Sequence, residues 1–73
     1  MNLYDRTTVY IPEHMLHPIL DWMRWTGYGR SWIEDAPRTA TGDVWLDTNV
    51  SGKRIIDAAL SDIAQGWTYP EEI

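Results

Sequence analysis

The sequence predicts a small single-domain α+β fold in the order β-α-β-β-α, with a short antiparallel sheet covered on one face by two helices. Three observations support this prediction. Residues 50–67 repeat apolar side chains with a helical period, residues 7–11 are all β-branched or aromatic, and residues 43–48 alternate as a half-buried strand does. An amphipathic helix this short is marginal in water, so the rest of the chain must cover its apolar stripe.

The helix predicted over residues 50–67 has suitable residues at both ends. Ser51 is the expected N-cap, because its hydroxyl can accept a hydrogen bond from an unpaired N–H of the first turn. Gly66 is expected just past the last turn, since glycine enters the left-handed region without a Cβ penalty. The apolar stripe consists of Ile55, Ile56, Ala59, Leu60, Ile63 and Ala64.

A second helix is predicted within residues 13–26, but Pro18 interrupts it. Proline removes the hydrogen bond to the carbonyl of His14 and clashes there. Two structures are compatible with this: a kinked helix over 13–26, or a turn over 13–16 followed by a helix over 18–26, which we favour. In both, the core-facing side chains are Met15, Leu16, Ile19, Leu20 and Met23.

Three strands are predicted. The first covers residues 7–11 and ends at Pro12, which cannot donate to a sheet ladder but fits the first position of a helix. The others cover 31–34 and 43–48, separated by a segment over 35–42 with loop chemistry. Because one loop joins these two strands, we expect them to pair as a hairpin.

The length of 73 residues indicates one domain over 1–73, with an ordered core over 7–67 and terminal segments over 1–6 and 68–73. A chain of this size buries only about 60–65% of its unfolded surface, so its stability margin is thin. It has no cysteine, so neither disulfides nor thiolate-bound metal can stabilise it. Aromatic burial or a partner chain must contribute instead.

The formal net charge of −5 disfavours non-specific binding to nucleic acid, which depends on neutralising phosphates. No apolar run approaches the length of a membrane span, and the N-terminus lacks the apolar region of a signal peptide. We therefore expect a cytoplasmic protein that does not associate with membranes.

Neither catalysis nor a cofactor is predicted. There is no cysteine nucleophile, no serine lies in a G-x-S-x-G turn, and a chain this short has little room for a supported pocket. His14 and His17, with Glu13 and Asp21 nearby, have donor types that bind zinc. Their spacing differs from the helical H-E-x-x-H motif, and Pro18 disturbs the helix, so no metal site is predicted.

An anion-binding candidate lies where the last strand meets the last helix, because free N–H groups and the helix dipole favour negative charge there. Lys53 and Arg54 oppose the dipole at this position and need a negative partner. We expect an intramolecular pair with Asp43 or Asp47, and the alternative is a bound phosphate or carboxylate. The candidate residues are Ser51, Gly52, Lys53 and Arg54.

The five tryptophans and four tyrosines exceed what so small a core can enclose. Some therefore serve as core residues, for which Trp45 or Trp32 together with Trp67 are the expected choices. Others form a contact surface, since Trp, Tyr, Met and Arg are enriched at interface hot spots. The residues predicted to bind a partner lie on or just beyond one helix and are Trp22, Met23, Arg24, Trp25, Tyr28 and Arg30.

The segment Thr7–His14, the apolar helix after it and the segment Thr26–Ile33 together resemble the opening of ribbon-helix-helix repressors and antitoxins. The resemblance covers about residues 7–35. It implies a strand, a helix, a Gly/Ser turn and a second helix, with dimerisation through the strand. It also implies a strand face, here Thr8 and Tyr10, that reads DNA bases.

The function expected from these features is that of a non-catalytic protein-binding module. A small acidic regulator or inhibitor of a larger protein, of the accessory type that phages and mobile elements carry, fits the aromatic surface and the charge. The partner is then a protein, and a homodimer stays open. The alternative is a dimeric DNA-binding regulator or antitoxin of the ribbon-helix-helix kind.

Overall fold

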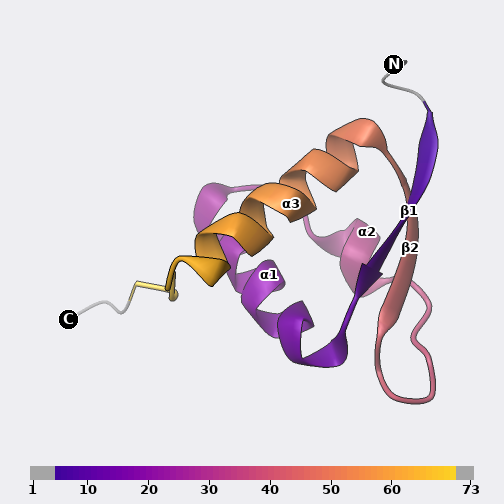
Figure 1. Cartoon of the computed structure of the whole chain (residues 1–73), viewed down its shortest axis with the longest axis horizontal. Helices are drawn as coiled ribbons and strands as arrows, with labels where there is room; N and C mark the ends of the chain where they lie inside the picture. The colour runs from indigo at the N-terminus through magenta and orange to yellow at the C-terminus, as the bar shows by residue number, and fades with distance from the viewer. Residues whose placement is uncertain (1–4, 71–73) are drawn as a thin grey trace.

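The computed structural model describes residues 5–70 and confirms the α+β class. Two antiparallel strands form a short sheet, and the helices all lie on one side of it (Figure 1). The elements in chain order are β1 (Arg6–Ile11), α1 (Glu13–Thr26), α2 (Ser31–Glu34), β2 (Val44–Asn49) and α3 (Val50–Ala64). The predictions for residues 1–4 and 71–73, parts of the terminal segments, lie outside the described residues.

The sheet has one buried and one exposed face. β1 pairs with β2 in a register that runs from Arg6 opposite Asn49 to Ile11 opposite Val44. Side chains alternate along both strands, as predicted, because successive residues of a strand point to opposite faces. The face toward the helices carries Thr7, Val9, Ile11, Val44, Leu46 and Thr48.

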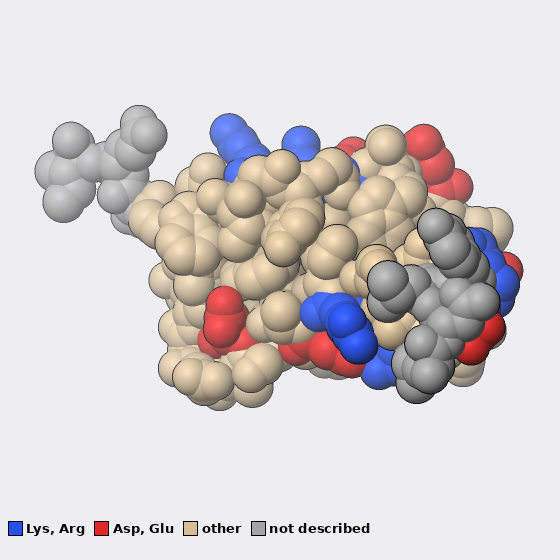
Figure 2. Space-filling model, turned by 90° about the horizontal axis from the view of Figure 1, so that it is seen from above, with Lys and Arg blue, Asp and Glu red and all other residues tan. Residues whose placement is uncertain are grey.

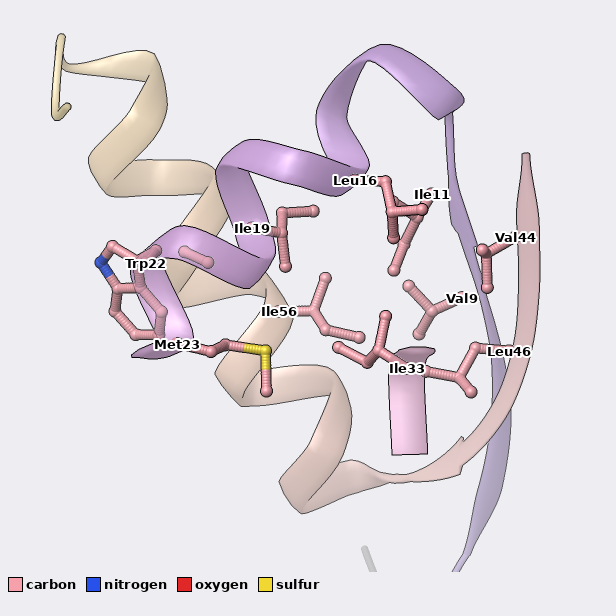
Figure 3. Close-up of a cluster of buried hydrophobic side chains, with 11 residues drawn as sticks. Val9, Ile11, Leu16, Ile19, Trp22, Met23, Ile33, Val44, Leu46 and Ile56 are labelled. Atoms are coloured by element: carbon pink, nitrogen blue, oxygen red, sulfur yellow. The ribbon is translucent and has the colours of Figure 1, made fainter. Parts of the chain in front are cut away.

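The core lies between the sheet and the helices, and every element contributes to it (Figure 3). Ile56 of α3 and Ile33 of α2 are completely buried, and in Figure 3 they point toward the strand residues Val9 and Leu46. The buried hydrophobic residues are Val9, Ile11, Leu16, Ile19, Trp22, Met23, Ile33, Val44, Leu46, Ile56 and Ala59.

The segment over 13–26 is a single helix with Pro18 inside it, so the favoured division into a turn and a shorter helix is wrong. The hydrogen bond that Pro18 removes would have reached the carbonyl of His14, a residue that is exposed. Water can hydrate that carbonyl. The buried stripe, which includes Leu16, Ile19 and Trp22, extends on both sides of the proline and keeps the helix continuous.

A distant carboxylate completes the start of α1. Pro12, at the N-cap position, has no side-chain group that can cap the helix. Asp43, just before β2, accepts a hydrogen bond from the backbone N–H of Glu13 at 2.8 Å and another from the Thr41 hydroxyl at 2.9 Å. These hydrogen bonds hold the pKa of Asp43 below its ordinary value, since both favour the charged form.

The prediction of a strand over 31–34 is wrong, because these residues form the short helix α2. The predicted hairpin with residues 43–48 is therefore absent, and β2 pairs with β1 instead. The backbone N–H of Glu34 donates to the carbonyl of Arg30 at 3.0 Å, and the two side chains form an ion pair at 3.6 Å. Ile33 is completely buried, so tertiary packing decides this segment against its β propensity.

The predicted final helix is confirmed as α3, with a correction at its start. Asn49, not Ser51, is the N-cap, and its side chain accepts from the N–H of Gly52 at 2.9 Å. Gly66 follows the helix with φ of +98°, as expected from its place beyond the last turn. Ala64 is exposed and lies outside the buried stripe.

The architecture that the resemblance to ribbon-helix-helix proteins implies is not observed. The strand β1 pairs with β2 of the same chain, because β2 provides the apolar face that completes the core. The second helix, α2, has only four residues and is followed by the loop that contains Pro37. Within residues 5–70, no helix combines the length and the apolar character needed to cross a membrane.

Gly52 is required for the close approach of α3 to β2. It is buried, and a Cβ at this position would overlap Oγ1 of the buried Thr48. We expect Gly52→Ala to lower the free energy of unfolding by about 1–2 kcal/mol, because overpacking outweighs the gain in helix propensity. Urea denaturation measures this. Gly29→Ala is the matched control, since a Cβ there meets no atom within 4 Å.

The overlap also predicts coupling between the two residues. In a Thr48→Ala background, the Oγ1 atom is gone, so Gly52→Ala should cost less than it does in the natural sequence. Equal costs in both backgrounds would show that the overlap with Thr48 does not limit this contact.

Asp43 predicts a pH dependence of stability. A carboxyl group whose pKa is lowered by folding stabilises the protein above its ordinary pKa of 3.8, and this contribution disappears as the pH falls through the folded value. We expect Asp43→Asn to be less stable than the natural chain at neutral pH, with the difference shrinking below about pH 4. Urea denaturation at several pH values measures both; a difference independent of pH would contradict the assignment.

Candidate functional site

The six residues predicted to bind a partner do not form one surface, because α1 divides them. Trp22 is only 5% exposed and Met23 is completely buried, so both belong to the core and not to a contact surface. Trp25, by contrast, is 51% exposed, and Arg24 lies beside it on the solvent side of the helix. Residues close together in a helix sequence can face different directions. Trp22 and Met23 fall on the buried stripe of α1, whereas Arg24 and Trp25 fall outside it.

Trp22 is fixed in the core by a polar contact at its edge. Its indole Nε1–H donates to Oδ2 of Asp62 on α3 at 2.8 Å, which joins α1 to α3. Tyr28, beyond the end of α1, stacks on the Trp22 ring with centroids 5.9 Å apart and planes inclined by 17°. Tyr28 is exposed on its other side, so it covers the tryptophan and faces solvent.

Four residues form an aromatic surface at the end of the molecule away from the sheet. The Trp25 ring lies 5.7 Å from that of Trp67, and Trp67 meets Tyr69 edge to face at 6.3 Å. The guanidinium of Arg24 lies 5.5 Å from the centre of the Tyr69 ring. We call Arg24, Trp25, Trp67 and Tyr69 the tail patch. Residues 67 and 69 thus join a surface that the sequence places on residues 22–30.

A second aromatic pair lies on the exposed face of the sheet. Tyr10 and Trp45 are opposite each other in the strand register, and their ring centroids are 4.7 Å apart. Trp45 is 56% exposed, so of the two alternatives predicted for the core, Trp45 and Trp32, the structure excludes Trp45. The alternation of β2 decides this, because Val44 and Leu46 face the helices. Of the other two tryptophans expected there, Trp32 and Trp67 are half-buried against the core.

Two of the four anion-binding candidates at the start of α3, Gly52 and Lys53, have partners within the chain. Gly52 donates its N–H to Asn49 and is buried, and the Lys53 ammonium lies 2.6 Å from Asp57. The negative partner of Lys53 is therefore Asp57, one turn along the helix, and not Asp43 or Asp47. Ser51 and Arg54 are exposed.

The two histidines are exposed on α1 and lie in no ligand cluster. Within residues 5–70, no three His, Cys, Asp or Glu side chains lie close enough together to hold a metal ion. Arg30, the last residue of the predicted partner surface, pairs with Glu34 and is half-buried at the start of α2.

A cavity of about 470 Å³ lies between β2, α3 and the turn before α2. Its titratable lining residues are Arg6, Tyr28 and Asp47. Arg6 and Asp47 bind each other, with the guanidinium 3.5 Å from the carboxylate and 3.1 Å from the carbonyl oxygen of Asp47. Both side chains are more than half exposed, so this ion pair lies in solvent at the rim.

The charged side chains are dispersed. On the face seen in Figure 2, basic and acidic groups lie near one another toward the edges, with a broad area of uncharged side chains between them. The three ion pairs of the described residues join neighbouring groups of opposite sign. On the face seen in Figure 2, the acidic side chains therefore do not gather in one patch.

Comparison of the chain with models of protein families, with curated proteins and with solved structures finds no match. The assignment of a function therefore rests on the geometry described above.

The different burial of Trp22 and Trp25 on α1 predicts different losses of stability when each is replaced by alanine. Trp22→Ala should lower the free energy of unfolding by about 3–5 kcal/mol, because it empties a core site and leaves Asp62 without its donor. Trp25→Ala should cost about 1 kcal/mol or less, since half of the ring is already in solvent. Urea denaturation followed by circular dichroism measures both changes. Equal losses would show that Trp25 is also a core residue.

Proposed function

We propose that this protein is a non-catalytic protein-binding module that contacts its partner through the tail patch. The observation that carries the proposal is the exposure of Trp25. This residue is 51% exposed, which is a large apolar surface to leave in water. Exposed tryptophan and tyrosine beside an arginine are typical of interface hot spots. Tyr28, exposed over the core residue Trp22, extends the aromatic surface of the same helix end.

The rings of the tail patch are held in place before any partner arrives. Trp67 contacts both Trp25 and Tyr69, and its backbone N–H donates to the carbonyl of Asp62 at 3.1 Å. Arg24 lies against Tyr69. Because side chains that are already ordered lose little entropy on binding, such a surface favours tight association.

The charge of the chain supports a regulator or inhibitor of a larger protein with a basic surface. At a net charge of −5, long-range attraction would speed the approach of such a partner, while contact specificity would come from the aromatic rings. The same charge weighs against binding to DNA. On the outer sheet face, the charge of Arg6 lies beside that of Asp47, which offsets its attraction for a phosphate.

Affinity capture with matched variants tests the proposal. The full chain, Trp25→Ala and Trp45→Ala are each immobilised and exposed to lysate of the native host, and retained proteins are identified by mass spectrometry. We expect one specific protein to bind the natural chain and Trp45→Ala but not Trp25→Ala. Loss of a hot-spot tryptophan costs about 2 kcal/mol or more, which weakens binding about 30-fold.

Trp45→Ala is a suitable control because it removes an equally exposed tryptophan from the opposite end of the molecule. Circular dichroism must show that both variants are folded. A partner that Trp25→Ala retains as well as the natural chain does would contradict the proposed surface. Retention of duplex DNA on a gel, weakened by salt and by Arg6→Ala, would support the DNA-binding alternative instead.

A further inference from the structure

The strand β1 has one edge that no strand of the described chain covers. The sheet has two strands, so β1 pairs with β2 along one edge only. Residues 7–11 of β1 contain no charge and no proline, and all are β-branched or aromatic. Natural edge strands usually carry charges or proline that prevent pairing with another chain. β2 follows this rule through Asp47 and through a backbone bridge between Arg38 and Val44, whereas in β1 the charge and the proline stand only at the ends, at Arg6 and just beyond Ile11 at Pro12.

We propose that two copies of this chain associate through their β1 edges, antiparallel, and form one continuous sheet in the order β2-β1-β1-β2. The proposal goes beyond the proposed function, because it concerns a different surface. The tail patch lies at the opposite end of the molecule from the sheet (Figure 1), so a dimer of this kind leaves it accessible. A sheet of only two strands is marginally stable by itself. Pairing two such sheets adds a third ladder of backbone hydrogen bonds, between the two β1 strands.

The faces of the sheet restrict the register. Directly opposed residues of an antiparallel pair share one face, so an outward residue of one copy must face an outward residue of the other. The outward residues of β1 are Arg6, Thr8 and Tyr10. With Thr8 on the two-fold axis, each Arg6 lies opposite Tyr10 of the other copy, and each Thr7 lies opposite Val9 on the core face.

This register brings complementary groups together on the outer face. Tyr10 already packs against Trp45 within each copy, and the side chain of Arg6 is 62% exposed. Opposite Tyr10, the guanidinium of Arg6 from the second copy reaches an aromatic face, which is a favourable cation–π arrangement. Like charges do not face each other at any of the outward pairs, because Thr8 meets Thr8 at the centre.

The mass of the chain in solution tests the proposal. Sedimentation equilibrium of the natural chain, up to about 1 mM, should give twice the chain mass of 8.5 kDa. Thr8→Lys and Thr8→Glu should each be monomeric at the same concentration, because like charges then face each other on the axis. An equimolar mixture of the two variants should return to twice the chain mass, since opposite charges now meet.

Two controls show whether the effect belongs to the β1 edge. Thr68→Lys adds the same charge at an exposed position of the tail and should stay dimeric, and so should Trp25→Ala, which tests the tail patch. Circular dichroism shows whether each Thr8 variant is folded, as expected for an exposed position. A monomeric natural chain, dimeric Thr8 variants, or a mixture that fails to dimerise would each overturn the proposal. None of these outcomes affects capture of a partner by the tail patch.

Discussion

The burial of a single sheet face is the constraint on which the rest of this structure depends. The two strands turn one face of about six side chains toward the helices, and the core forms against it. Ile56 of α3 and Ile33 of α2 are both completely buried against that face. Because the sheet is narrow, the helices must also cover one another, which the hydrogen bond from Trp22 to Asp62 reinforces.

This small core determines which aromatic residues are free to act. Trp22 is buried in the core, and Trp32 and Trp67 are partly buried against it. Trp25 and Trp45 are each more than half exposed. The two exposed tryptophans lie at opposite ends of the molecule, one on the tail patch and one on the outer sheet face. The domain therefore has two separate surfaces on which a tryptophan is exposed.

Sequence patterns were reliable where one element determined its own structure. The alternation predicted over residues 43–48 and the apolar stripe of the last helix each contain enough apolar positions to define a period. The strand is confirmed one residue later, over 44–49, and the stripe is confirmed except for Ala64. Residues 31–34 contain only Trp32 and Ile33 as apolar positions, too few to distinguish a strand from a helical turn. A similar limit applies to the predicted surface. Arg24 and Trp25 are exposed, but Trp67 and Tyr69, which contact them, are remote in sequence and no local pattern links them to residues 22–30.

The sequence by itself determined the α+β class, the positions of both strands and the helix that covers them, because local periodicity and propensity decide which face of each element is apolar. Only the tertiary structure decided that β1 is the partner of β2, that α1 continues through Pro18, that Asp43 completes its first turn, and that the chain's tail meets Trp25. Each of these depends on contacts between residues far apart along the chain, and a local sequence pattern does not specify such contacts.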